Sequence, residues 1–141
     1  MIAAQLSSLD VLALTIYGEA RGEPVEGQIA VGCVVRNRVY KDRDFRIICL
    51  EPKQFSCWNE DDSNYPILED LSHKMMNSLP IINPELSQIR WVAAGIINNL
   101  ILDNTGGSKN YLTTTLYYSN TIRWSATMKI SKVIGKQIFL V

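Results

Sequence analysis

The hydrophobic positions near the start of the chain repeat with the period of an α-helix. Apolar residues within 9–20 recur three and four positions apart, which is the spacing of one helix face. A serine can cap the start of this helix, and Gly22 can end it. Pro24 at a first-turn position opens a second helix that runs to about Val39. We therefore expect two helices that meet at a tight corner around residues 21–24.

The pattern is less regular in the middle of the chain. Residues 40–66 mix charges, proline, aromatics and asparagine with no sustained period, which indicates a long ordered loop with room for a short turn of helix. A modest helix is expected over 67–79. Asn83 as a cap and Pro84 at the first helical position start a further helix, whose apolar face continues to Ile101 and which a glycine pair ends.

The last third of the chain changes character. Residues 111–118 and 132–140 are rich in β-branched and aromatic side chains, which predicts short strands that pair as a small sheet or ribbon. The sequence contains no internal repeat and no flexible linker, and 141 residues with 47% apolar composition fit one domain with one core. The expected fold is a single α+β domain over residues 1–141, predominantly helical, with a small C-terminal β element.

Charge and hydropathy exclude several classes of partner. Fourteen basic and fourteen acidic residues give a net charge of zero, so no overall field attracts nucleic acid or anionic lipid. The longest apolar runs fall well short of the roughly 20 residues that a membrane span needs. No secretory signal is visible at residues 1–8. We expect a monomer that binds no nucleic acid and does not insert into a membrane.

The few cysteines and the single histidine limit metal chemistry. With three cysteines, no Cys-x-x-Cys pair and only His73, the sequence supports neither a zinc site nor a dense disulfide framework, and we expect no metal and no cofactor. Cys33 lies in an apolar helical pattern and is expected in the core. Cys49 and Cys57 flank a turn-like segment; they could form a disulfide in an oxidising compartment or remain two reduced thiols.

Glu19 is the acidic residue whose position is unusual. It lies at the edge of the first helix's apolar face, where a carboxyl can be partly desolvated, and desolvation favours the protonated form. It also lies in the last turn, facing the negative end of the helix dipole. Broken local rules of this kind often mark functional sites, although an ordinary solvated residue at a helix end has the same position.

A resemblance to a known family gives this position a meaning. The run from Ile16 to Val31, with Asn37 and Arg38 after it, resembles the opening of the SleB-type cell-wall hydrolases. Residues 49–59 are similar to that family's second signature, especially in its shorter phage and prophage members. The blocks at 111–113, 116–118, 124–125 and 134–139 are similar to its C-terminal blocks in order and spacing, so the resemblance covers nearly the whole chain.

The resemblance implies a lysozyme-like domain that cuts the bond between N-acetylmuramic acid and N-acetylglucosamine in peptidoglycan glycan strands. Glu19 would be general acid and then base in a lytic transglycosylase, which leaves a 1,6-anhydro end because the sugar's own 6-hydroxyl replaces water. A hydrolase would normally need a second carboxylate about 5 to 9 Å away. Glu23 and Glu26 are expected to support the corner between the helices, and the acidic run at 60–62 is either a second acid or a solvated loop.

Polar and aromatic residues are the candidates for holding sugar rings. Gln54 and Ser56 could hydrogen-bond to hydroxyl or acetamido groups, whereas flat side chains could stack on pyranose rings or belong to the core. These flat candidates are Phe55, Tyr117, Tyr118 and Trp124. Arg21 is either a partner of Glu19 or a cation at a helix C-terminus. Many family members carry histidine at the positions of Tyr118 and Gln137.

Four other functions remain as alternatives. A muramidase would use water as the nucleophile, an N-acetylmuramoyl-L-alanine amidase would normally hold zinc with three protein ligands, and a wall-binding module would have lost the chemistry. A Cys-His peptidase would need a cysteine beside His73. With no export signal and no repeat-type anchor visible, the resemblance favours an endolysin that is made in the host cytoplasm and reaches the cell wall through a holin-type pore. A host-secreted or virion-associated lysin fits as well.

Overall fold

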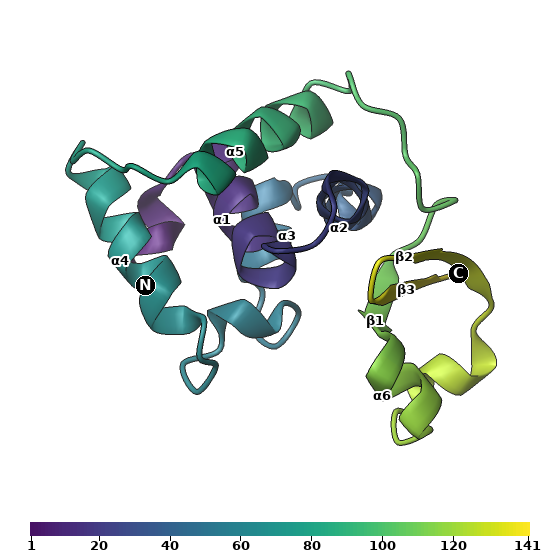
Figure 1. Ribbon diagram of the computed structural model, residues 1–141. Helices are drawn as coiled ribbons and strands as arrows, with labels where there is room; N and C mark the ends of the chain where they lie inside the picture. The colour runs from purple at the N-terminus through teal and green to yellow at the C-terminus, as the bar shows by residue number, and fades with distance from the viewer.

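The computed structural model describes residues 1–141 as a helical body with a small lobe formed by the C-terminal third (Figure 1). The body contains five α-helices and two short 3-10 helices, and the lobe contains three strands, a short helix and another 3-10 turn. In chain order these are η1 (Ile2–Gln5), α1 (Ser8–Ala20), α2 (Val25–Arg38), α3 (Phe45–Leu50), η2 (Ser56–Trp58), α4 (Tyr65–Met76), α5 (Pro84–Ile97), β1 (Asn110–Thr113), α6 (Thr114–Ser119), η3 (Trp124–Thr127), β2 (Ile130–Ile134) and β3 (Gln137–Leu140).

Helix α1 is the central element of the body. The Ser7 side chain caps it by accepting a hydrogen bond from the backbone N–H of Asp10 at 3.1 Å. Every residue from 11 to 16 is buried, including Thr15, because α2, α3, α4 and α5 all pack against this helix. The sequence predicted one apolar face, but a helix surrounded by others buries all its sides. Its two ends are half-buried, at residues 8–10 and 17–19.

Helix α5 crosses the body and ends earlier than predicted. The Asn83 side chain caps its start, accepting from the N–H of Leu86 at 3.0 Å. Its end is a Schellman motif: Asn99 adopts a left-handed conformation at φ 55°, and the N–H of Leu100 donates to the C=O of Gly95 at 2.8 Å. The expectation that the helix continued to Ile101 was therefore wrong, because Ile101 folds back onto Gly95 instead.

Residues 40–66 contain more helix than predicted. Helix α3 begins where the Asp44 side chain accepts a hydrogen bond from the N–H of Ile47 at 3.0 Å, and its buried face contacts α1. The short turn η2 follows and also packs on α1. Three loops, at 39–44, 51–55 and 59–64, separate these pieces from one another and from α2 and α4, so the prediction of one long loop was wrong in detail. At six and three residues, the two helices are too short to show a period.

The lobe is built around an antiparallel sheet of order β1-β3-β2. Its central strand, β3, is buried along its whole length, and alternate residues point to opposite faces. Ile138 and Leu140 pack with Leu112 inside the lobe, whereas Phe139 packs against α2. The prediction of strand over 111–118 was correct only up to Thr113, because the Thr113 side chain then caps α6 by accepting from the N–H of Leu116 at 3.2 Å.

Polar contacts fasten the segment between α5 and the sheet to α2. The Asn37 side chain donates to Asp103 at 3.0 Å and to the C=O of Ser108 at 2.9 Å. Burial alone would raise the pKa of Asp103, but hydrogen bonds from Thr105, Asn37 and Gly107 outweigh it and lower that pKa. These contacts fix where β1 begins beside the body. None of the helices is both long and apolar enough to span a bilayer.

Candidate active site

The carboxylate of Glu19 lies where three separate elements meet. It leaves the last turn of α1 and is half-buried. One oxygen, Oε2, accepts from the backbone N–H of Cys57 at 3.2 Å and from the Ser56 hydroxyl at 3.3 Å, both on η2. The other oxygen, Oε1, accepts from the Tyr111 hydroxyl of β1 at 2.7 Å. The side chain is therefore held from two sides.

Two of these three partners are hydroxyl groups, which matters for acid–base chemistry. A hydroxyl can donate to a carboxylate, or rotate and accept from a carboxylic acid, whereas a backbone N–H can only donate. The Ser56 and Tyr111 hydroxyls can thus remain hydrogen-bonded to Glu19 whether its carboxyl is ionised or protonated. A residue that gives up a proton and later takes one back needs surroundings of this kind.

The turn η2 approaches α1 closely because the residue facing it is glycine. A Cβ added at Gly18 would lie 2.7 Å from the Cβ of Cys57 and 2.9 Å from its Sγ. The indole N–H of Trp58 also donates to the buried Thr15 hydroxyl at 3.0 Å, which ties η2 to the middle of α1. These contacts bring the Cys57 N–H and the Ser56 hydroxyl within reach of Glu19.

Tyr111 reaches Glu19 because its ring packs against the face of the sheet that covers α2. Its ring centroid lies 5.5 Å from that of Phe139, which is fully buried. Burial, together with the negative charge of Glu19, raises the pKa of the Tyr111 hydroxyl well above its usual value of 10.0. The hydroxyl therefore remains neutral and keeps its proton available for the contact with Glu19.

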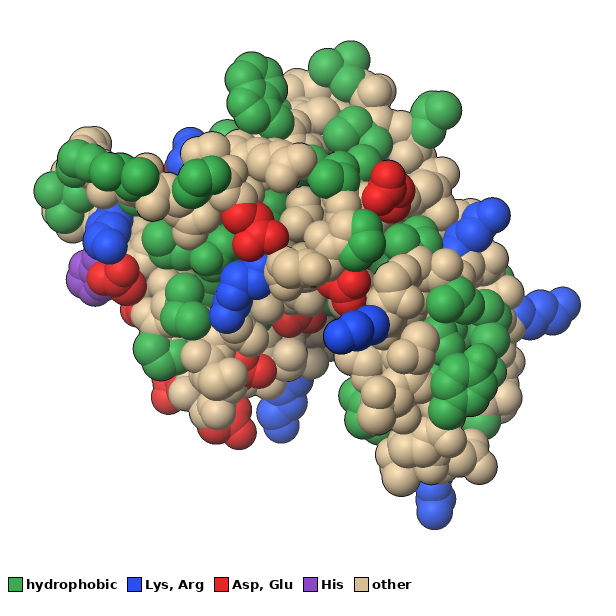
Figure 2. Space-filling view, in the orientation of Figure 1, with side chains coloured by type: hydrophobic (Ala, Val, Ile, Leu, Met, Phe, Trp, Pro, Cys, Tyr) green, Lys and Arg blue, Asp and Glu red, His purple; other side chains and the backbone are tan.

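A cavity of about 400 Å³ opens beside Glu19. It lies between the helical body and the lobe, where the surface is notched in Figure 2. Glu19 is the only acidic side chain among the residues that line it. The others are Gly18, Arg38, Lys53, Gln54, Ser56, Asn64, Tyr111, Leu112, Thr113, Leu116, Ile122, Trp124 and Gln137. A single carboxyl therefore faces a mixed polar and apolar cleft of a size that suits a sugar ligand.

Comparison with known proteins identifies the family. A model of the cell wall hydrolase family matches residues 22–140, which is most of the chain. The chain belongs to the cell wall hydrolase family. The predicted membership of a SleB-type family is confirmed, as is a helix-dominated α+β fold with a small β element.

Individual relatives agree with this assignment. The spore cortex-lytic enzyme of Oceanobacillus iheyensis is 31% identical over 100 residues, which cover 61% of this chain and 36% of that enzyme. The enzyme of the same name from Bacillus subtilis is 52% identical over 33 residues, covering 23% of this chain and 11% of that enzyme. The chain thus spans at most 36% of the length of the curated relatives that it matches.

Two solved structures resemble the whole fold. The catalytic domain of the Bacillus cereus SleB protein superposes with a TM-score of 0.64 at 25% identity, over 95% of this chain and 89% of that one. The catalytic domain of the germination-specific lytic transglycosylase SleB from Bacillus anthracis gives a TM-score of 0.63 at 25% identity, over 95% of this chain and 93% of that one. Both similarities extend across the helical body and the lobe.

The structure divides the predicted sugar-binding residues of this cell wall hydrolase into two groups. Gln54, Ser56 and Trp124 line the cavity. Phe55 does not, since it is 1% exposed and lies in the core. Tyr117 packs inside the lobe, and Tyr118 is exposed outside the cavity, so neither faces Glu19. The predicted stacking of sugar rings on these three aromatics has no support in this arrangement.

The corner between α1 and α2 is held differently from the prediction. Glu85 of α5 accepts from the N–H of Gly22 at 2.8 Å, so an acid distant in sequence supports the turn. Glu26 is exposed, and the side chain of Glu23 packs beside Gly135 of the lobe. Arg21 lies 5.1 Å from the ring of Tyr17 in a cation–π contact and forms no ion pair with Glu19.

The remaining acids and thiols lie away from the cleft. None of the residues at 60–62 lines the cavity; Asp62 instead accepts from the N–H of Asn64 at 2.8 Å. Cys33, Cys49 and Cys57 are buried free thiols, so the disulfide left open by the sequence is not formed in this structure. His73 is exposed on α4, and no three His, Cys, Asp or Glu side chains lie close enough together to hold a metal ion.

Several lining residues were missed as site residues by the sequence analysis. They include Tyr111, Arg38, Lys53, Asn64 and Gln137. Tyr111 and Arg38 belong to blocks that resemble the family, and that resemblance was the signal that could have found them. Gln137 is 4% exposed, and its Oε1 is buried without a hydrogen-bond partner at the wall of the cavity.

Proposed function

We propose that this chain cleaves the glycan strand of peptidoglycan at the bond between N-acetylmuramic acid and N-acetylglucosamine, as a lytic transglycosylase with Glu19 as its acid and base. The family assignment supports peptidoglycan as the polymer. The single observation that carries the mechanism is that Glu19 is the only carboxyl in the cleft. A hydrolase of either stereochemistry normally has a second carboxylate opposite the first.

In the proposed reaction Glu19 acts twice. Its protonated carboxyl first donates a proton to the glycosidic oxygen, so that the bond from that oxygen to C1 of N-acetylmuramic acid breaks. The resulting carboxylate then accepts the proton of the 6-hydroxyl of the same sugar while that oxygen bonds to C1. Glu19 returns to its starting state and no water is consumed, so one carboxyl is sufficient.

The experiment that tests this proposal examines the ends of the products. Purified protein is incubated with peptidoglycan and the released fragments are analysed by mass spectrometry. We expect N-acetylmuramic acid ends that lack the mass of one water, as a 1,6-anhydro end does. Reducing ends that carry that water would instead show a muramidase. Release of stem peptides with intact glycan would show an amidase, and an absence of fragments would leave only wall binding.

A substitution at Glu19 tests its role directly. Glu19→Gln keeps the shape of the side chain and removes the acid, so cleavage should fall by at least about 1,000-fold while the fold persists. Glu23→Gln is the matched control, because Glu23 lies just beyond the corner and outside the cavity. It should retain near-normal cleavage. Activity that survives in folded Glu19→Gln would remove Glu19 from the mechanism.

We further propose that the protein acts as an endolysin, made in the cytoplasm of a bacterial host and released to the wall by a separate holin-type pore. The resemblance to shorter phage and prophage members supports this role. Expression in a bacterial host with and without a pore-forming partner tests it, with lysis expected only when both proteins are present. Lysis of that host by this protein alone would contradict the requirement for a pore.

A further inference from the structure

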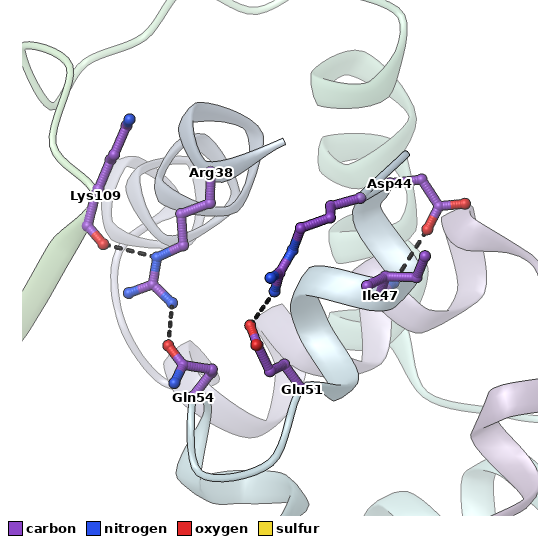
Figure 3. Close-up of polar contacts among 7 residues, drawn as sticks. Arg38, Asp44, Ile47, Glu51, Gln54 and Lys109 are labelled. Carbon is purple, nitrogen blue, oxygen red and sulfur yellow. Dashed lines mark hydrogen bonds and ion pairs between the residues drawn. The ribbon is translucent and has the colours of Figure 1, made fainter. Parts of the chain in front are cut away.

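Arg38, at the end of α2, is a half-buried cation without a carboxylate partner. Its Nε donates to the C=O of Lys109 at 2.7 Å, and its Nη1 donates to Oε1 of Gln54 at 3.4 Å (Figure 3). Its guanidinium carbon lies 5.0 Å from the centre of the Phe55 ring. All of these contacts are to neutral groups, and Nη2 makes no hydrogen bond within the protein.

Three other cations of the molecule form ion pairs with carboxylates, which Arg38 does not. Arg43 pairs with Glu51, which is labelled in Figure 3, and Arg90 pairs with Asp10 at 2.8 Å. Burial lowers the pKa of Arg38 below its usual value, although the negative charges of Glu51 and Glu19 act in the opposite direction without forming an ion pair with it. A guanidinium held in this way favours the arrival of an anion, to which its free Nη2 can donate a charge-assisted hydrogen bond.

Arg38 also faces a second cavity, which continues from the cleft at Glu19. This second cavity has a volume of about 450 Å³ and shares Arg38, Lys53, Gln54, Tyr111 and Trp124 with the first. Asn110 and Met128 complete its lining. It contains two cations and no acidic side chain. The exposed ammonium of Lys53 adds to the positive potential near Arg38.

We propose that this second cavity binds a carboxylate attached to the N-acetylmuramic acid unit beside the cleaved bond. The inference rests on the proposed function, because it takes peptidoglycan as the substrate. The sugar rings of peptidoglycan are neutral, and its anions are attached through the lactyl ether. The carboxylate is one of the stem peptide or, on units whose stem has been removed, that of the lactyl group itself. The Arg38 guanidinium binds this carboxylate directly, and the positive charge of Lys53 attracts it from solvent.

Binding of chemically altered glycan strands tests this site. Glu19→Gln protein serves as the background, so that the strands are not cut, and affinity is measured by calorimetry at low salt. The strands are compared before and after their carboxyl groups are converted to amides with carbodiimide and ammonia. We expect amidated strands to bind at least about five-fold more weakly, with the difference reduced at high salt. Equal affinities for the two kinds of strand would overturn the proposal.

Substitutions locate the effect within the cavity. Lys53→Gln in the same background should weaken binding of carboxylate-bearing strands by about two- to five-fold and leave amidated strands unaffected. Lys132→Gln, an equally exposed cation on β2, is the matched control and should change neither. Arg38→Gln should cause a loss of about ten-fold or more, and Lys53→Gln decides the matter if Arg38→Gln does not fold. An equal loss in Lys53→Gln on both kinds of strand would also overturn the proposal.

Two further comparisons separate the sources of the anion and the two proposals. Treatment with an amidase removes the stem and frees the lactyl carboxylate, which the stem had held as an amide. Affinity that is lost with the stem assigns a stem carboxylate, and affinity that persists shows that the freed lactyl carboxylate binds at this site. If the Glu19→Gln variant binds strands in a carboxylate-dependent way but the unaltered protein releases no fragments, the anion site is supported and the lytic activity is refuted. If the unaltered protein releases fragments but binding is the same with and without carboxylates, the lytic activity is supported and the anion site is refuted.

Discussion

At the scale of single residues, Tyr111 is the group whose removal should most clearly separate catalysis from folding. Its hydroxyl donates to Glu19 at 2.7 Å, while its ring packs on Phe139. Tyr111→Phe keeps the ring and removes the donor. A hydrogen bond to a charged group contributes about 1.5 to 3 kcal/mol, so kcat should fall by about ten- to one-hundred-fold. Steady-state cleavage of soluble glycan strands measures this, with KM changing less than kcat.

Tyr117→Phe is the control for that prediction. Tyr117 is half-buried within the lobe, and its hydroxyl does not line the cleft. The substitution should leave both kcat and KM close to normal. A folded Tyr111→Phe protein with undiminished kcat would show that the hydroxyl does not position Glu19 for catalysis.

At the scale of elements, the contact between α1 and η2 depends on Gly18. Alanine within a helix is normally more stable than glycine by about 0.5 to 1 kcal/mol. At position 18, however, a methyl group would lie 2.7 Å from the Cβ of Cys57 and 2.9 Å from a methyl of Leu68. Gly18→Ala should therefore destabilise the protein by about 1 to 3 kcal/mol and, by displacing the donors of η2 from Glu19, reduce cleavage about ten-fold or more. Thermal unfolding and turnover are measured together.

Gly27→Ala provides the comparison for this element. Gly27 lies in the first turn of α2, where the nearest atom to an added Cβ is the side-chain Cβ of Glu23 at 3.3 Å. This change should be close to neutral for both stability and activity. If Gly18→Ala behaved like Gly27→Ala, the close approach of η2 to α1 would not be what positions the donors.

The elements also show which parts of the fold are readable from sequence. The starts of α1 and α5 were predicted because Ser7 and Asn83 are caps that act through neighbouring backbone. Helix α6 was missed because the β-branched and aromatic residues over 114–118 favour a strand. The segment is nevertheless helical because the Thr113 side chain caps it and the following backbone hydrogen bonds continue the helix. Local composition therefore failed where a short element depends on one capping side chain.

The candidate site divides in the same way. Glu19 could be proposed from its place at a helix end and from family resemblance. Its partner Tyr111 lies 92 positions further along the chain, and only the packing of the sheet on α2 brings the two together. Phe55 looked like a sugar platform but is buried beneath Arg38, because exposure depends on neighbours that no local pattern reveals. Long-range packing, rather than residue type, assembled the cleft.

At the scale of the whole molecule, buried groups that resist ionisation should make the fold sensitive to alkali. Burial raises the pKa of the Cys49 thiol from 9.0 to about 12, and burial together with the charge of Glu19 raises that of Cys57 further. The unfolded chain releases these protons at lower pH than the folded protein does. The stability that they contribute is therefore complete below about pH 9 and is lost as pH rises from there through the folded-state values.

Urea unfolding under reducing conditions, at several values between about pH 7 and about pH 11, measures this loss. Each pH unit above 9 should remove up to about 1.4 kcal/mol per buried thiol from the free energy of unfolding. Cys49→Ala leaves a small cavity and lowers stability at neutral pH, yet its stability should decline less steeply with pH than that of the unaltered protein. Because the two proteins differ only at position 49, the difference between the two slopes isolates Cys49. Parallel slopes would mean that this thiol ionises as easily inside the fold as outside it.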